Sequence, residues 1–321
     1  MGLTRYVFGR LGQLLPVVVG MSIASFLLVH LIPGNAIELY LGTQVSPTPE
    51  QMEELKRIFG LSGPIYEQYG RWALRILHGD MGYSLRTGQP VLPSILNALP
   101  LSAELAFLAI LFAVIVGVPL GVLAAARRNT TMDLGVRTFG LLGLSIPDFW
   151  LATLAVIVLS RFPLTSSWVA LGRYVPLEVS PLDNLKILAV PAVAFGLGLA
   201  AVLMRFTRTA ALDVLSSDYV RTARAKGLTD RAVLYRHVLR NALFPVITVV
   251  GYYAGYLIGG TAVIEQVFAL PGMGRFVLQA VSQRDYPVVQ GVVLVVGAAF
   301  VLVNLLVDIG YTLLDPRVRY S

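Results

Sequence analysis

The chain has no cysteine and few charged side chains, and both absences limit what it can be. Of its 321 residues, 13% are charged and 56% are hydrophobic, whereas soluble domains are about 25% charged. Without cysteine, disulfides and thiolate chemistry are excluded. The composition indicates an integral membrane protein, and its net charge of +7 reflects membrane topology rather than binding to nucleic acid.

Catalytic and nucleotide-binding patterns are also missing. His30, His78 and His237 lie far apart and no H-E-x-x-H motif occurs, which argues against a zinc enzyme. No G-x-x-x-x-G-K-S/T motif occurs, so the chain does not bind ATP through a P-loop. No nucleophile–base pair is recognisable. We therefore predict a protein that is not an enzyme, with no catalytic, cofactor-binding or metal-binding residue of its own.

Six long apolar runs predict six membrane-spanning helices and an all-α fold. In residues 11–32, His30 is the sole ionisable side chain, and as a helix this run extends for roughly 33 Å, enough to cross the hydrocarbon core. No small-x-small cleavage site follows it, so a span is favoured over a cleaved signal peptide. The other spans are expected near residues 101–126, 138–160, 187–208, 242–264 and 288–310.

Composition divides the chain into three parts. Residues 1–32 form a basic arm and the first span, residues 33–97 a polar helical insertion, and residues 98–314 the main membrane domain. Lysine and arginine are more frequent in the segments that this arrangement places in the cytoplasm, as is usual for membrane proteins. We therefore expect both termini to be cytoplasmic and the insertion to be extracytoplasmic.

Two amphipathic helices are predicted in the insertion. Residues 48–51 form a capping box with proline at the first helical position, and Gly60 is expected to end that helix. A second helix begins after Pro64. Both helices either lie on the membrane surface, contact an extracytoplasmic partner or pack on the spans. The apolar face of the second helix consists of Ile65, Tyr69, Trp72 and Ile76.

Small residues recur one helical turn apart in two predicted spans. Gly117 and Gly121 form one such pair, and Gly251, Gly255 and Gly259 form a longer stripe. Small residues at this spacing let a second helix approach closely. We therefore predict that both stripes pack against other helices, within the chain or in a neighbouring membrane protein.

One acidic side chain falls well inside a predicted span. Asp148 follows Pro147, which breaks a helical hydrogen bond, so Asp148 is expected beside a broken turn. Since a charge at mid-span costs about 2.5–3.5 kcal/mol, its carboxylate should face protein or water. Asp148 either packs at an interface or contacts a substrate, and Tyr252 and Tyr256 either line a water-filled path or pack in the bundle. Glu265 is expected at the outer membrane interface.

The most strongly charged segment between two spans, residues 213–241, predicts two short helices joined by a glycine turn. Ser217 is suited to cap the first helix, and Asp218 to its first turn, where the helix dipole favours negative charge. Gly227 stands where a left-handed residue ends a helix, and Thr229 caps the second helix. The expected apolar residues are Leu215, Tyr219 and Ala223 in the first helix and Leu234 and Val238 in the second.

Three interpretations compete for this segment. It is a solvated loop, basic because cytoplasmic loops are basic; or a helix-turn-helix DNA reader; or a docking element for a cytosolic partner. The flanking spans tether it to a bilayer, which argues against DNA binding. We favour docking, in which Gly227 reverses the chain and presents Ala223 and Ala225 to a partner groove.

The segment resembles the EAA loop of ABC importer permeases, in the variant of the dipeptide, oligopeptide and nickel group. The general motif has a glutamate where this chain has Arg221. Other segments resemble the same group: residues 79–84 (G-D-x-G-x-S, where Asp80 should bond backbone amides), 145–149 (S-x-P-x-F), 271–274 and 315–317. The matching residues of the loop are Tyr219, Thr222, Ala223, Ala225, Lys226, Gly227, His237, Leu239, Arg240, Asn241, Ala242 and Pro245.

The resemblance to a B-type dipeptide permease implies a type I ABC importer permease fold in the bacterial cytoplasmic membrane. The implied partners are a second homologous permease, two cytoplasmic ATPase subunits that bind ATP and Mg, an extracytoplasmic substrate-binding protein and the lipid bilayer. In that scheme the glycine stripes serve the permease interface, and Asp148, Tyr252, Tyr256 and Glu265 serve the translocation path or gate. The implied ATPase-coupling residues are Ser217, Asp218, Tyr219, Arg221, Thr222, Ala223, Arg224, Ala225, Lys226 and Gly227.

The substrate stays open between dipeptides, longer peptides, glutathione and nickel chelates, all of which this group serves. A channel or secondary transporter that needs no partner is the competing class. Ion-coupled carriers usually bury several ionisable groups near the midplane, and only Asp148 is a good candidate here.

Overall fold

A computed structural model describes residues 3–31, 48–58, 62–162, 168 and 171–314. These residues form helices and connecting segments, and no strand occurs among them beyond an isolated bridge between Tyr83 and Pro90. The all-α prediction is confirmed for this part of the chain. Two compact units are present, Met1–Pro100 with Phe276–Ser321, and Leu101–Arg275. Gly60 and residues 315–317, two sites of sequence predictions, lie outside the described residues.

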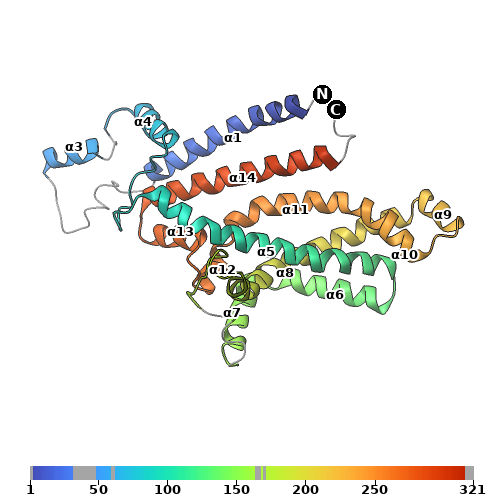
Figure 1. The fold of residues 1–321 in the computed structure, drawn as a ribbon. Coiled ribbons are helices and arrows are strands. Elements are labelled where there is room, and N and C mark those ends of the chain that lie inside the picture. The colour runs from blue at the N-terminus through green and yellow to red at the C-terminus, as the bar shows by residue number, and fades with distance from the viewer. Residues whose placement is uncertain (1–2, 32–47, 59–61, 163–167, 169–170, 315–321) are drawn as a thin grey trace. The chain divides into compact units, whose positions relative to one another are not determined.

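In the first unit, α1 (Leu3–Leu31) lies beside α14 (Tyr286–Leu314) (Figure 1). The side-chain amide of Gln290 donates to the carbonyl oxygen of Ser25 at 3.1 Å, and the Ser25 hydroxyl donates to the carbonyl oxygen of Gln290 at 3.3 Å. Nearer the other end, Arg10 pairs with Asp308 at 3.3 Å. The first and last long helices are therefore fastened to each other at two levels.

The two helices predicted in the insertion are present as α3 (Pro49–Ile58) and α4 (Ile65–Leu77). The capping box before α3 is confirmed, because the amides of Thr48 and Gln51 each donate to the side chain of the other residue, at 3.0 and 3.3 Å. Helix α4 packs on α1: Tyr69 lies 5.5 Å from Phe26 between ring centroids, and its hydroxyl is 2.8 Å from that of Ser22. Of the three locations predicted for these helices, packing on a long helix is therefore the one found for α4.

The glycine turn that follows α4 is built as predicted. Gly79 and Gly82 have positive φ angles of 80° and 77°, a region that suits glycine. The Asp80 carboxylate accepts from the Gly82 amide and from Arg75 Nε, each at 2.8 Å. The hydrogen bond from Arg75 and the one from Gly82 lower the pKa of Asp80.

The same turn is joined to the start of α14 by a buried carboxylate that the sequence did not indicate. Asp285 is 3% exposed. It accepts hydrogen bonds from the Ser84 hydroxyl and, at 3.1 Å, from the Leu85 amide. A contact between residues 200 positions apart therefore closes this end of the first unit.

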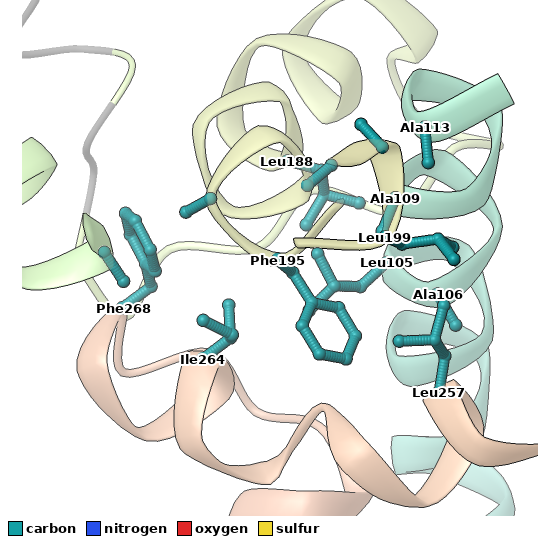
Figure 2. Packing of buried hydrophobic residues seen from close by; sticks show 14 of the residues in the cluster. Leu105, Ala106, Ala109, Ala113, Leu188, Phe195, Leu199, Leu257, Ile264 and Phe268 are labelled. Atoms are coloured by element: carbon teal, nitrogen blue, oxygen red, sulfur yellow. The ribbon is translucent and has the colours of Figure 1, made fainter. Parts of the chain in front are cut away.

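The second unit is organised around α8 (Pro181–Leu215), a helix of 35 residues. The elements around it are α5 (Val91–Ala126), which begins in the first unit, α6 (Thr131–Ser145), α7 (Asp148–Leu159), α11 (Arg240–Gly260) and α12 (Ala262–Val267). The unit also contains the short helices α9 (Asp218–Ala225) and α10 (Asp230–Val233) and the start of α13 (Met273–Ser282). Figure 2 shows side chains of α5, α8, α11 and α12 meeting in one apolar core. Its labelled members include Leu105, Leu188, Phe195, Leu257 and Ile264.

Helices α5 and α8 approach each other at glycines. A Cβ atom added to Gly117 would lie 2.5 Å from the carbonyl oxygen of Ala200, and one added to Gly121 would lie 2.5 Å from that of Met204. On the opposite helix, Gly196 is equally close to the carbonyl oxygen of Ala109. Since real Cβ atoms do not come this close to a backbone, any side chain at these positions would push the helices apart.

The span predicted near residues 138–160 is two helices. Helix α6 ends at Ser145, α7 begins at Asp148, and their axes differ by 95°. Pro147 explains the break, because the residue before a proline is forced out of the helical region, and Ile146 is extended, with φ −93° and ψ 122°. Among the described residues, three helices are long and apolar enough to cross a membrane, or up to five if each bent pair counts once.

We expect Gly117→Ala to destabilise the second unit and Gly135→Ala to leave it unchanged or slightly more stable. Overpacking at a tight contact costs about 1–3 kcal/mol. Gly135 lies on the exposed face of α6 with nothing within 4 Å of an added Cβ, so the matched change gains up to about 1 kcal/mol of helix propensity. Thermal unfolding of the purified protein in detergent measures both. Equal unfolding midpoints for the two variants would contradict the contact.

Candidate functional site

The segment with the most specific motif lies where α8 and α11 are connected. We call residues 213–241 the coupling segment. After α8 ends at Leu215, it contains α9 (Asp218–Ala225), α10 (Asp230–Val233) and a π-helical turn (Leu234–Leu239) that leads into α11. Figure 1 shows α9 and α10 at the end of the second unit, far from α12.

Gly227 ends α9 in the way that the sequence predicts. Its φ angle is +82°, in the left-handed region that favours glycine. The Gly227 amide donates to the carbonyl oxygen of Arg224 at 2.9 Å, and the Leu228 amide to that of Ala223 at 3.2 Å. These two bonds form a Schellman motif, which turns the chain sharply between α9 and α10. The hydroxyl of Thr229 then accepts from the Ala232 amide and caps α10.

The buried face of α9 differs from the predicted one. Val220 is fully buried and Ala223 is 7% exposed, whereas Tyr219 is 46% exposed. Of the expected stripe, Ala223 belongs to the buried side and Leu215 packs on the same core, whereas the prediction for Tyr219 is wrong. The stripe counted through a helix that is interrupted after Leu215. Ser217 occupies the N-cap position, but its hydroxyl donates to the carbonyl oxygen of Val214 and does not cap α9.

A small core beneath α9 holds the coupling segment to the long helices. Ala223 belongs to this core, so the prediction that it enters a partner groove is wrong, while Ala225 is exposed. The core connects the ends of α5 and α8 with α9, α10, the π-helical turn and α11. Its members are Ala125, Ala211, Val220, Ala223, Val233, Val238 and Ala242.

The outer face of α9 is polar and carries a net positive charge. The exposed residues of α9 and of its C-cap are Asp218, Tyr219, Arg221, Thr222, Arg224, Ala225 and Lys226. Arg221 lies 3.6 Å from Asp218, and Arg224 lies 3.2 Å from Asp230 at the start of α10. Exposed pairs of this kind contribute little stability, so the outer face is available to a partner.

Three residues of the loop motif meet on one side of α9. The side-chain amide of Asn241 donates to the Tyr219 hydroxyl at 3.1 Å and to the carbonyl oxygen of His237 at 2.8 Å. The rings of Tyr219 and His237 are 6.3 Å apart between centroids. Hydrogen bonds in a π-helix join residues five apart, so His237 and Asn241 lie at different angles around the helix axis than they would in an α-helix. Such turns are frequent at functional sites.

A buried ion pair, which the sequence did not indicate, involves Arg208 of α8, between one and two helical turns before the coupling segment. Asp133 of α6 is fully buried, and its carboxylate accepts two hydrogen bonds from Arg208 of α8, at 2.7 and 2.9 Å. The Asn129 amide donates to it at 3.0 Å, and Arg137 lies 3.5 Å away. A lone acidic residue among Arg127, Arg128 and Arg137 was the available signal.

The break between α6 and α7 borders a cavity of about 290 Å³. Asp148 lines it together with Tyr253 and Tyr256 of α11. Asp148 is partly buried, and no hydrogen bond or ion pair to its carboxylate is found within the described part of the chain. Tyr252, which is 65% exposed, is not among the lining residues. Sequence reasoning therefore found Asp148 and Tyr256 but missed Tyr253.

Glu265 has a different environment from the one expected. It is fully buried, not interfacial. The Ser102 hydroxyl donates to it at 2.6 Å and the Arg275 amide at 2.8 Å. Gly272 makes room for it, since an added Cβ there would lie 2.3 Å from the carboxyl carbon. Glu265 does not line the Asp148 cavity, and its geometry is that of a structural carboxylate.

The longer glycine stripe on α11 is divided by burial. Gly251 and Gly255 are buried, whereas Gly259 is exposed. Together with Gly117 and Gly121, which face α8, most of the small residues in these two stripes are therefore covered within the unit. Gly259 is the one left at its surface.

Comparison with known proteins matches nearly all of the chain. The family model described as "Binding-protein-dependent transport system inner membrane component" covers residues 117–320, and that of the corresponding N-terminal component covers residues 3–106. A peptide transport system permease protein of Brucella abortus (strain 2308) is 45% identical, with 99% of this chain and 100% of that protein aligned.

Dipeptide permeases and one solved structure are also similar. The dipeptide transport system permease protein DppB of Alkalihalophilus pseudofirmus is 38% identical, and that of Escherichia coli (strain K12) is 36% identical, each with at least 98% of both chains aligned. The inward-facing MetNI methionine ABC transporter matches with a TM-score of 0.53 at 18% identity, over 69% of this chain and 96% of that chain. At that identity the likeness concerns the fold alone. The chain therefore belongs to the binding-protein-dependent transport system inner membrane components, as a multi-pass permease of the ABC transporter type.

Proposed function

We propose that this chain is the B-type permease of an ATP-driven importer that moves dipeptides or short oligopeptides across the cytoplasmic membrane. The observation that carries the proposal is the coupling segment, a short helix closed by Gly227 and seated on the ends of the long helices. The relatives named as dipeptide permeases support the choice of substrate. Glutathione and nickel chelates are the alternative cargoes.

The proposed assembly contains a second homologous permease, two cytoplasmic ATPase subunits that bind ATP and Mg, and an extracytoplasmic binding protein. In it the chain crosses the membrane six times, with both termini in the cytoplasm and residues 33–97 outside. The exposed face of α9 docks on an ATPase subunit, and Gly259 contributes to the contact with the second permease.

Movement of an ATPase subunit would reach the membrane helices through rigid contacts. The inner face of α9 packs on a core that contains residues of α5, α8 and α11. The pair between Asp133 and Arg208 joins α6 to α8 close to the same end. A push on α9 therefore acts on several long helices together, which suits the switching of access between the two sides of the membrane.

The cavity beside Asp148 is the best candidate for a part of the translocation path. Broken helices in transporters expose backbone groups and place polar residues where substrates pass. Here the break at Ile146 and Pro147 positions the Asp148 carboxylate, which has no bonded partner among the described residues, in a cavity that two tyrosines also line. A carboxylate suits the free ammonium group of a peptide, and the tyrosine rings offer apolar surface with a hydroxyl.

We expect Gly227→Val to uncouple ATP hydrolysis from peptide uptake, and Gly227→Asn to retain most coupling. Valine is strained at a φ of +82° by about 1–2 kcal/mol, whereas asparagine tolerates this region. No atom lies within 4 Å of an added Cβ, so only backbone conformation separates the two variants. The measurement is the ratio of uptake to ATP hydrolysis in vesicles that contain the whole importer.

Normal uptake by Gly227→Val would contradict the docking role. Uptake by vesicles that contain this chain alone would contradict the importer assignment and favour a channel or secondary transporter.

We predict that Asp133→Asn lowers both stability and coupling. Removing one partner of a buried ion pair costs about 3–5 kcal/mol, because the other charge remains buried. Glu178→Gln, a change at an exposed carboxylate of the α7–α8 connection, is the control. Thermal unfolding reports stability, and the uptake-to-hydrolysis ratio of the protein that stays folded reports coupling. If that ratio is unchanged, Asp133 is structural only.

Asp148→Asn should reduce the maximal rate of peptide uptake about tenfold, the loss expected for one charge-assisted hydrogen bond of about 1.5 kcal/mol. Tyr256→Phe should reduce the rate less, and Tyr252→Phe should have no effect because Tyr252 lies outside the cavity. Uptake is measured with saturating binding protein, so that delivery is not limiting. Equal rates for Asp148→Asn and the unmodified protein would remove this cavity from the path.

A further inference from the structure

A second cavity, of about 170 Å³, lies between α6 and α8 and has ends of opposite character. Arg137 of α6 and Arg205 and Arg208 of α8 line it near the coupling segment. Leu144 and Ala201 line it further along the helices. Its walls therefore change from cationic to aliphatic along the helix axes, as the surroundings of a lipid do between headgroup and acyl chains.

Positive charge at the cationic end is only partly balanced. The Asp133 carboxylate accepts hydrogen bonds from Nε and Nη2 of Arg208 and from the Asn129 amide, and Arg137 lies 3.5 Å away. No carboxylate pairs with Arg205 within the described ranges, and its guanidinium carbon lies 5.9 Å from the centre of the Phe206 ring. Of the three guanidinium groups that line this cavity, those of Arg208 and Arg137 share Asp133, and Arg205 has no carboxylate partner among the described residues.

Arg205 is exposed and the Arg137 side chain is 48% exposed, so both guanidinium groups are accessible to an anion at the mouth of the cavity. Arginine forms paired hydrogen bonds with phosphate more readily than lysine does. The outer surface of α6 beside the cavity is apolar, with Leu141 64% exposed and Leu142 55% exposed. A ligand with a phosphate and long hydrocarbon chains satisfies both the charge and this surface.

We propose that this cavity binds the headgroup phosphate of one anionic phospholipid from the cytoplasmic leaflet. The phosphate meets Arg205 and Arg137, and the acyl chains lie on the exposed leucines of α6. The cavity is far smaller than a whole lipid, so only the headgroup region enters it. The leaflet rests on the proposed topology, in which this end of α8 is cytoplasmic, where anionic lipids attract basic residues.

A lipid at this position would brace α6 against α8 beside the pair of Asp133 and Arg208. It would also lie next to the end of α8 from which the coupling segment starts. Binding of the lipid needs this chain alone, so it can be measured apart from transport.

The test measures lipid retention by the purified chain, without any transport assay. The chain is extracted from membranes, exchanged into mixed micelles containing equal amounts of phosphatidylglycerol and phosphatidylcholine, and analysed by native mass spectrometry. We expect one phosphatidylglycerol to be retained preferentially. Arg205→Gln should weaken that retention roughly tenfold. Arg128→Gln, at an exposed arginine that does not line the cavity, should leave it unchanged.

Several outcomes would overturn the proposal. Equal retention of the two lipids, or equal weakening by Arg128→Gln, would show non-specific attraction to basic charge. If millimolar inorganic phosphate displaced the lipid, the acyl chains would contribute nothing to its binding. The cavity would then be a simple anion site. A cross-link from a cysteine at Leu141 to a second permease would show that protein covers this face. None of these results would affect the importer assignment, which the uptake measurements test separately.

Discussion

The close contact between α5 and α8 is the constraint on which the second unit depends. Gly117 and Gly196 bring backbone against backbone, with carbonyl oxygens only 2.5 Å from where a Cβ atom would stand. In an apolar solvent the hydrophobic effect contributes little to helix association, so tight packing of this kind carries more of the stability. Helices α6, α7 and α11 pack around α8. Residues at the ends of α8 and α5 belong to the core that the inner face of α9 contacts.

Three acidic residues of this unit differ in whether their carboxylates have hydrogen-bond partners. Asp133 and Glu265 are fully buried, and each is satisfied by hydrogen bonds from a neighbouring element. Asp148, in contrast, lines a cavity and has no bonded partner among the described residues. Because a buried polar group without partners is costly, satisfied carboxylates indicate structural roles and the unsatisfied one marks the place where a ligand or water is expected.

Membership of the permease family and the form of the coupling segment agree with each other. A short helix ended by a left-handed glycine packs its inner face against five other elements, which are α5, α8, α10, the π-helical turn and α11. Its outer face is polar, cationic and free of strong internal pairing. A helix that is packed on one face and polar on the other suits docking of a separate protein. We therefore propose that an ATPase subunit binds the outer face of α9.

The sequence by itself determined the helical class, the capping box before α3, the glycine turn at Gly227 and the break at Pro147, because each depends on the conformational limits of one or two neighbouring residues. Only the tertiary structure decided which face of α9 is buried, since an interruption of two residues after Leu215 changes the phase of the helix. It also decided that Glu265 is buried and that Asp133 meets Arg208, 75 residues away. Contacts at such separations depend on how helices pack, and no local pattern encodes them.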